Sequence, residues 1–306
     1  MNFGIPYMGS KSDIIENIMR LIPKSENFYD LFGGGFAVTH AAILFKKAKT
    51  YHFNEIKPDT VDLIQRAIRG EFNYDNFKPP WVSREEFSAR KDTDAYVRLL
   101  WSFGNNQTCY LFGKDIEPYK KSLHMAVVFD EFDDIAIKAL GVKAWPFGVK
   151  SINKRRLVVR YLVKKMNPKF KPTQLQQLQQ LERLQQLQQL QQLQQLQQLQ
   201  TNILWTSNDY REIEIKNDSV VYCDPPYAGT CDYDNESAFN HKEFWDWARL
   251  VRQPLFVSEY TVPSDFRVVG KYHRKTKLSQ AGTTKTKPEL LVCNQIAYDL
   301  CFKPKT

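Results

Sequence analysis

Four consecutive residues in the last third of the chain, Asp224-Pro225-Pro226-Tyr227, combine residue types that can do chemistry. They directly follow the apolar run SVVYC at 219–223. The Asp224 carboxylate and the Pro225 carbonyl offer two hydrogen-bond acceptors, and the prolines fix the turn without adding a competing N–H donor. Tyr227 adds a flat ring for a planar heterocycle. Such a site suits the exocyclic amine of a base, whose nitrogen becomes more nucleophilic when it donates two hydrogen bonds. A plain proline turn after a strand is the alternative for the motif taken alone.

A glycine-rich turn, Asp30-Leu31-Phe32-Gly33-Gly34-Gly35, forms a second group of candidate residues. Glycines at a strand-to-helix turn let a ligand approach the backbone closely. Glu55 ends the next strand-like run, where an acid can bind the two ribose hydroxyls of a nucleoside. The Gly-x-Gly-x-x-Gly spacing of a dinucleotide site is absent. A tight turn without a ligand and a solvated glutamate are the alternatives.

The elements that would position these residues alternate between strand and helix. Apolar spacing predicts helices at 12–22, 36–48, 59–70 and 241–251. Strand-like runs lie at 27–32, 50–56, 202–205, 219–223, 254–260 and 289–298. This order predicts an α/β fold with a parallel-rich, doubly wound sheet and a β-hairpin at its end.

Residues 71–170 interrupt the alternation and predict a mainly helical module inserted into the sheet domain. Residues 56–173 carry 22 Lys and Arg against 14 Asp and Glu, or +8, so nearly the whole formal charge of +9 lies there. The ten basic residues between 143 and 171 are not interrupted by an acid, and a second acid-free run with seven lies at 267–287. Two such runs favour a surface for a polyanion, with a solvated charged face as the alternative.

A low-complexity tract, 174–200, repeats Leu-Gln-Gln and is broken once by Glu182-Arg183. Its composition favours a helix. With a period of three, each leucine lags about 60° behind the last, so the apolar stripe winds around the helix. A variable spacer and a self-association arm are both open interpretations.

Composition narrows the class of protein. No apolar run approaches the roughly 20 residues of a membrane span, and the first residues lack the pattern of a signal peptide. Five scattered cysteines without a Cys-x-x-Cys pair argue against a disulfide framework or a zinc site. We therefore expect a cytoplasmic protein.

Six segments, in their order along the chain, resemble the Dam-type family of DNA adenine-N6 methyltransferases. They are Pro6 to Lys11, Asp30 to Gly35, Asn54 to Ile56, Asp209-Tyr210, Asp224 to Tyr227, and Lys287 to Leu291. The resemblance covers 1–60 and 201–300, whereas the middle is only loosely similar and the Leu-Gln-Gln tract departs from the pattern. It implies a Rossmann-like core that depends on S-adenosylmethionine and methylates adenine N6 in the DNA of a bacterium or phage, for example in restriction-modification.

The resemblance also implies roles for matching residues. The catalytic residues would be Asp224, Pro225, Pro226 and Tyr227. The cofactor-binding residues would be Tyr7, Lys11, Asp30, Gly33, Gly35, Glu55, Asp209 and Tyr210. Among these, Glu55 would hold the ribose and Asp209 the adenine ring of the cofactor. No metal is expected, because the sulfonium of the cofactor is already activated.

In this family the module between the two halves reads double-stranded DNA, which is therefore the expected partner. Asn105 and Asn106 are candidates for reading base edges, because amide side chains pair well with adenine. The candidate phosphate contacts are Lys114, Lys120, Lys121, Lys154, Arg155 and Arg156. A surface loop without DNA contacts is the alternative for each.

The expected organisation is a split catalytic and cofactor-binding domain, 1–57 and 201–306, with a target-recognition module at 58–173 and the repeat at 174–200. Three other functions stay open. Cytosine-N4 methylation uses the same exocyclic-amine chemistry, and RNA is another possible substrate. The third is a catalytically idle DNA-binding protein, which the intact acid and glycines disfavour.

Overall fold

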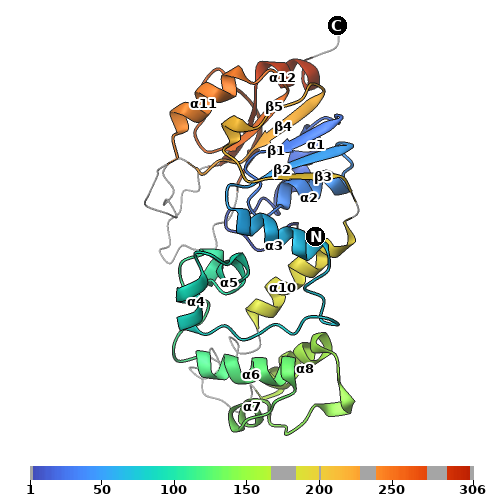
Figure 1. Ribbon diagram of the computed structural model, residues 1–306, viewed down its shortest axis with the longest axis vertical. Helices are drawn as coiled ribbons and strands as arrows, with labels where there is room; N and C mark the ends of the chain where they lie inside the picture. The colour runs from blue at the N-terminus through green and yellow to red at the C-terminus, as the bar shows by residue number, and fades with distance from the viewer. Residues whose placement is uncertain (1–2, 167–183, 200, 228–238, 274–287, 304–306) are drawn as a thin grey trace. The chain divides into compact units, whose positions relative to one another are not determined.

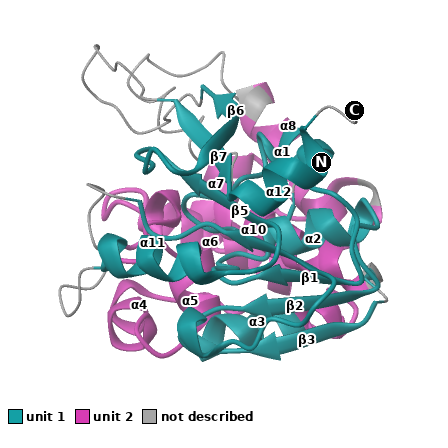
Figure 2. Cartoon of the chain, turned by 90° about the horizontal axis from the view of Figure 1, so that it is seen from above, with its two compact units in different colours: residues 1–65, 198–306 teal, residues 66–197 magenta. Residues whose placement is uncertain are grey.

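The computed structural model describes residues 3–166, 184–199, 201–227, 239–273 and 288–303 of the 306-residue chain. The chain divides into two compact units, Met1–Gln65 with Gln198–Thr306 and Arg66–Gln197, which are coloured separately in Figure 2. Among the described residues, all the named strands belong to the first unit, and the second is helical. The repeat as far as Gln197 falls within the second unit.

The first unit is built on a seven-stranded sheet with the order β3-β2-β1-β4-β5-β7-β6 (Figure 1). The strands are β1 (Asn27–Asp30), β2 (Thr50–Asn54), β3 (Ile203–Thr206), β4 (Ser219–Cys223), β5 (Leu255–Glu259), β6 (Arg267–Tyr272) and β7 (Glu289–Cys293). Strands β1 to β5 run parallel to one another, whereas β7 is antiparallel to both β5 and β6. The chain order reverses between β1 and β4, and open α/β sheets bind ligands at the carboxyl edge of such a point.

Alternating side chains of these strands enter two apolar layers, which is why central strands are apolar on both faces. On one face, Phe28 and Tyr222 pack with α1 (Ile15–Leu21), α2 (Ala37–Leu44) and α12 (Gln295–Cys301). On the other, Tyr29 and Val221 pack with α11 (His241–Leu250). The helix α3 (Pro58–Ile68) follows β2. The core thus holds the strand ends in fixed positions.

The sequence-based fold prediction is confirmed for the sheet, for its terminal antiparallel pair and for the helical insertion. Two strand predictions differ from the structure: β6 (Arg267–Tyr272) is not among the predicted strands, and the run 289–298 is not one strand. The strand β7 ends at Cys293, and the side chain of Asn294 accepts a hydrogen bond from the Ala297 N–H and so caps α12. The apolar residues beyond Asn294 belong to a helix.

The second unit contains short helices around its own apolar core, which includes Leu123, Val127, Val159, Val163 and Leu187. Its elements are α4 (Arg84–Arg90), α5 (Ala95–Leu100), η1 (Phe103–Asn105), α6 (Glu117–Phe129), α7 (Asp134–Leu140), η2 (Pro146–Gly148), α8 (Ile152–Met166), α10 (Gln185–Gln195) and η4 (Leu196–Gln198). Side-chain caps fix several helix starts; for example, Ser83 and Glu86 form a capping box at α4.

The second part of the Leu-Gln-Gln tract forms α10 and is packed inside this unit. Leu199 is half-buried, and the other five described leucines of the regular stretch are at most 1% exposed: Leu184, Leu187, Leu190, Leu193 and Leu196. Because the leucines wind around the helix, α10 has neighbours on several sides. Its glutamines contact those neighbours: the Gln189 amide donates to Asn105 at 2.7 Å, and that of Gln194 donates to the Phe72 carbonyl at 2.8 Å. This part of the repeat is therefore core structure.

Candidate active site

The carboxyl edge of the sheet collects acidic side chains from four neighbouring strands. Asp30 and Glu259 are the last residues of β1 and β5, and Asp224 directly follows β4. Glu289 reaches the same edge from the start of the antiparallel β7, where its neighbour Leu290 pairs with Glu259. Asp30, Glu259 and Glu289 are each 1% exposed. Buried carboxylates need charged or hydrogen-bonding partners, so their contacts define the site.

Lys11 connects the N-terminal segment to this edge. Its Nζ lies 2.6 Å from Asp224 Oδ2 and 3.5 Å from Glu289 Oε1. The Lys11 side chain is only 2% exposed, and its ammonium also lies 4.7 Å from the centre of the Tyr227 ring. One cation thus binds two carboxylates and faces an aromatic ring. The structure places Lys11 beside the predicted catalytic acid.

Asp224 remains accessible at one end, because 20% of its side chain is exposed. Burial raises the pKa of its carboxyl, whereas the nearby ammonium of Lys11 opposes that rise. Oxygen Oδ2 pairs with Lys11. Oxygen Oδ1 is buried and no donor among the described residues meets hydrogen-bond geometry with it, but the Tyr227 hydroxyl is close enough to the carboxylate to lower the pKa of Asp224. Asp224 therefore offers one acceptor oxygen to a ligand.

Tyr227 lies against a second aromatic residue that the sequence reasoning did not identify. Its ring meets that of Tyr260 edge to face, with 4.5 Å between the centroids. Tyr260 follows β5, and its backbone N–H donates to the Glu259 carboxylate at 2.6 Å. Burial, with the nearby charge of Asp224, raises the pKa of the Tyr227 hydroxyl. The two rings bring an aromatic surface next to Asp224.

Asp30 is held by the start of α2. Its Oδ2 accepts hydrogen bonds from the Thr39 N–H at 3.2 Å and the Thr39 hydroxyl at 2.7 Å. Oxygen Oδ1 is buried and has no hydrogen-bond partner among the described residues. Burial raises the pKa of Asp30 to about 7, against the lowering effect of Thr39. An unpaired, buried acceptor at the switch point is suited to a cationic ligand group.

The glycine turn follows Asp30 and is packed so closely that larger residues are excluded. A Cβ on Gly33 would lie 2.0 Å from the Phe53 ring, and one on Gly35 would lie 2.4 Å from Cβ of Tyr7. The Gly34 N–H donates to Glu55 Oε2 at 2.8 Å. Tyr7, the turn and Glu55 therefore form one assembly beside Asp30.

Asp209 and Tyr210 lie at the start of η5 (Tyr210–Glu212). The Asp209 carboxylate forms an ion pair with Arg211 at 2.8 Å, and its hydrogen bonds with Arg211 lower the pKa of Asp209. Tyr210 packs against Phe32, with 5.0 Å between ring centroids. Because Phe32 belongs to the glycine turn, η5 is anchored to the same edge of the sheet.

The predicted DNA contacts in the second unit fall into two groups. Lys114, Lys121 and Lys154 are exposed. Lys120 and Arg155 are buried, and Arg156 donates to the Leu187 carbonyl at 2.9 Å and to the Gln191 side chain at 2.6 Å. Arg155 forms an ion pair with Asp130 at 3.3 Å. In this arrangement the second group stabilises the fold.

The two predicted base-reading residues have polar partners within the second unit. Asn105 accepts a hydrogen bond from Gln189, and Asn106 accepts from the N–H groups of Thr108 and Cys109. Asn106 thus supports a local turn. Their carboxamide oxygens are engaged in the described structure.

Asn54, Glu259 and Glu289 belong to the site but were not identified from sequence by their own chemistry. Asn54 donates to the carbonyls of Leu31 and Asn208 and accepts from the Asn208 N–H, so it ties three loops together. The sequence could have indicated Glu259, because an acid at the end of an apolar strand is unusual. Glu289 was noted only as part of the resemblance.

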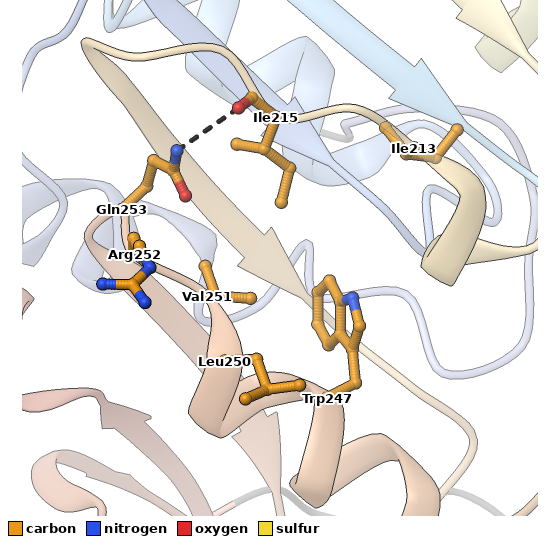
Figure 3. A pocket seen from close by; sticks show the side chains of 7 residues that line it. All are labelled: Ile213, Ile215, Trp247, Leu250, Val251, Arg252 and Gln253. Atoms are coloured by element: carbon orange, nitrogen blue, oxygen red, sulfur yellow. Dashed lines mark hydrogen bonds between the residues drawn. The ribbon is translucent and has the colours of Figure 1, made fainter.

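A shallow pocket of about 240 Å³ lies elsewhere on the first unit (Figure 3). It is lined by residues that precede β4 or β5 or end α11: Ile213, Ile215, Trp247, Leu250, Val251, Arg252 and Gln253. These segments lie at the amino ends of the strands, so the pocket is separate from the acidic edge.

Within the described residues, no group of His, Cys, Asp and Glu has a metal-binding arrangement. None of the described helices combines the length and apolar character needed to cross a membrane.

The strand order, the antiparallel β7 and the acidic carboxyl edge define a Rossmann-like methyltransferase fold. A family model of D12 class N6 adenine-specific DNA methyltransferases matches residues 7–123 and 162–278, which is most of the chain. The chain belongs to this family, and the predicted family resemblance is confirmed. A search of curated proteins gave no match to the chain. The family supports DNA methylation at adenine N6 as the activity, with DNA as the substrate, and its methyltransferases typically use S-adenosylmethionine.

Proposed function

We propose that this protein is a site-specific enzyme that transfers a methyl group from S-adenosylmethionine to adenine N6 in double-stranded DNA, with Asp224 as the acceptor for the target amine. The observation that carries the proposal is the state of the Asp224 carboxylate. One oxygen is held by Lys11 at 2.6 Å, and the other is buried without a well-aligned donor in the described structure. Membership of the family supports adenine as the target base and DNA as the polymer.

The residues beside Asp224 fit the proposed cofactor. The buried Oδ1 of Asp30 lacks a partner among the described residues, and it suits the ammonium of the cofactor's methionine part. The turn Gly33 to Gly35 leaves backbone groups close to the same place, and Glu55 is suited to the ribose hydroxyls. When bound, S-adenosylmethionine supplies an electrophilic methyl group, and the protein contributes mainly position and electrostatics.

Asp224 acts on the amine of the target base. Its Oδ1 accepts one N–H of the amine, and the Pro225 carbonyl accepts the other. These two bonds would make the nitrogen lone pair available for attack on the methyl group that S-adenosylmethionine would supply, with the cofactor sulfur as the leaving group. One amine proton would leave to Asp224 or to water. The ammonium of Lys11 opposes the rise in the pKa of Asp224 that burial causes, and so favours the charged form, which is the stronger acceptor.

The amine of a paired adenine is inaccessible within the duplex, so the base must be turned out of the stack. Tyr227 supports this step, because its ring is held by Tyr260 beside the acceptor oxygen. Stacking on aromatic rings contributes about 1–3 kcal/mol per base in proteins that bind unstacked bases.

Methyl transfer from labelled S-adenosylmethionine to mixed-sequence duplex DNA, followed by nucleoside analysis, tests the proposed function. We expect the label in N6-methyladenine. Label in N4-methylcytosine would keep the mechanism but correct the base. A protein that binds the cofactor but labels neither duplex DNA, single-stranded DNA nor RNA would instead be an idle DNA-binding protein.

Cofactor affinity should depend on pH through Asp30. Because burial raises the pKa of this carboxyl to about 7, it is largely protonated at pH 5.5, and a cationic ligand must displace the proton. The Kd for S-adenosylmethionine should therefore fall about 10- to 30-fold between pH 5.5 and 7.5. Equilibrium dialysis measures this change. Asp30→Asn should bind weakly at every pH, and a flat profile in the wild type would remove Asp30 from the ammonium site.

We propose the second unit as the module that reads the DNA, with α8 as a phosphate-binding element. The described exposed side chains on α8 include Lys154, Tyr161 and Lys165, which lie seven and four residues apart along the helix. These spacings place them along one side of the helix. No acid occurs between 143 and 171, so the positive potential of this side is not neutralised by its own segment.

Salt dependence of DNA binding tests the role of α8. Lys154→Ala should make the slope of log K against log salt less negative by about 0.9, the value for one lost phosphate contact. Lys138→Ala, at an exposed position on α7, is the matched control and should leave the slope unchanged. Equal slopes for Lys154→Ala and the wild type would take this residue off the DNA surface.

Self-association through the repeat is not part of the proposal. The leucines of α10 are buried within the chain, and the rest of the tract, up to residue 183, lies outside the described residues. Because the proposed substrate is DNA, we propose the cytoplasm of a bacterial or phage-infected cell as the location.

A further inference from the structure

We propose that Glu289 is a positioning residue for methyl transfer, because its carboxylate takes over the Lys11 ammonium when the target amine engages Asp224. This inference rests on the proposed function and adds to it a residue that contacts neither substrate nor cofactor. It follows from the position of one buried cation between two carboxylates.

The distances describe a cation that can be shared. Lys11 Nζ lies 2.6 Å from Asp224 and 3.5 Å from Glu289, so a shift of about 1 Å would exchange the nearer partner. The two side chains differ in accessibility: Asp224 is 20% exposed, whereas Glu289 is 1% exposed. A substrate can therefore reach Asp224, and Glu289 is left as the internal partner of the lysine.

The charges of the cluster explain why a second carboxylate is useful. Lys11 with Asp224 alone would sum to zero, and the cation would compete with the amine for the acceptor oxygens. With Glu289 the three side chains sum to −1. The amine nitrogen gains positive charge as the N–C bond forms, and a net negative cluster stabilises that charge in a site with little water.

The backbone fixes Glu289 at this position. It is the first residue of β7, paired with Tyr272 of β6, and the next residue pairs with Glu259 of β5. The central sheet thus sets its distance from the end of β4. Besides Lys11 and Glu289, the ionisable side chains that influence Asp224 or are influenced by it include Tyr227, Tyr222, Cys223 and Asp30.

Glu289→Gln tests the inference, because it removes the charge and keeps the shape. We expect kcat for DNA methylation to fall about 10- to 100-fold, with the Kd for S-adenosylmethionine within about twofold of the wild type. The charge of Glu289 raises the pKa of Asp224, so the acid limb of the kcat–pH profile should move to lower pH in the variant. Glu289→Asp keeps the charge and should recover most of the rate. Glu26→Gln, at an exposed carboxylate paired with Lys49, is the control.

Two results would overturn the inference. One is a Glu289→Gln variant with the wild-type kcat. The other is a loss of rate that is the same at every pH and that Glu289→Asp does not restore, which would show that Glu289 only supports the fold. Thermal unfolding of each variant separates misfolded protein from slow enzyme. If the wild type itself transfers no methyl group to DNA, the proposed function fails, and the inference fails with it.

Discussion

Asp224→Ala should abolish most methyl transfer while leaving the cofactor bound. The variant removes both carboxylate oxygens, so the target amine loses its principal acceptor and the Lys11 ammonium keeps only Glu289. Groups that assist proton transfer in a transition state contribute about 10²- to 10⁴-fold, and we expect kcat to fall by that factor. Single-turnover transfer from labelled S-adenosylmethionine to duplex DNA measures the loss.

The pattern of effects distinguishes a catalytic acid from a structural one. Equilibrium dialysis should show cofactor affinity within a few-fold of the wild type, because the proposed cofactor contacts lie on other strands. Asp224→Asn keeps an acceptor oxygen and should lose less activity than Asp224→Ala. Asp299→Ala, at an exposed position on α12, should have no effect. If Asp224→Ala retained more than about a tenth of wild-type kcat, Asp224 would not be the acceptor for the target amine.

Leu190→Ala should destabilise the second unit even though it changes one residue in a low-complexity tract. Leu190 is fully buried at the middle of α10, and truncating a buried leucine to alanine costs about 2–5 kcal/mol. Trp81 and Trp101 lie in the same unit, with 5.0 Å between their ring centroids. Three other tryptophans, Trp205, Trp245 and Trp247, lie in the first unit, so urea unfolding should be followed by amide hydrogen exchange of the second unit's helices as well as by fluorescence.

The matched control is Gln195→Ala, an exposed position in the same helix. Surface substitutions of this kind change stability by less than about 0.5 kcal/mol. Were the repeat a spacer or an assembly arm, both variants would unfold at the same urea concentration as the wild type, and Leu190→Ala would instead change the mass in solution.

Residues that determine local structure were predictable from sequence. The strands before Asp30 and Asp224 were correctly placed because central strands are short apolar runs that end in turn residues. The motif order then located the acids, since the carboxyl ends of parallel strands meet at one edge of the sheet. The strand β6 at Arg267–Tyr272 is absent from the predicted strands. The helix at the end of the chain is misassigned, because an apolar run can continue from a strand into a helix when a cap such as Asn294 separates them.

Contacts between segments distant along the chain were not predictable. Nothing near Lys11 indicates that its ammonium lies between Asp224 and Glu289, more than 200 residues away in sequence. The basic run at 143–171 correctly indicates excess positive charge, yet it does not reveal that Arg155 and Arg156 turn inward to backbone carbonyls. Periodicity describes one element, whereas such pairings depend on how elements pack together.

The repeat in α10 leaves the register of this helix ambiguous, because every Leu-Gln-Gln triplet presents the same side chains to the surrounding core. A screw motion by three residues, about 4.5 Å along the axis, returns leucine to every leucine position and glutamine to every glutamine position. The ends of the repeat resolve this degeneracy. If the chain shifted forward by three residues, Arg183 would occupy the position where Gln186 is buried beside His124. If it shifted back by three residues, Ile203 would be pulled out of β3. The alignment of this helix is therefore encoded where the repetition stops.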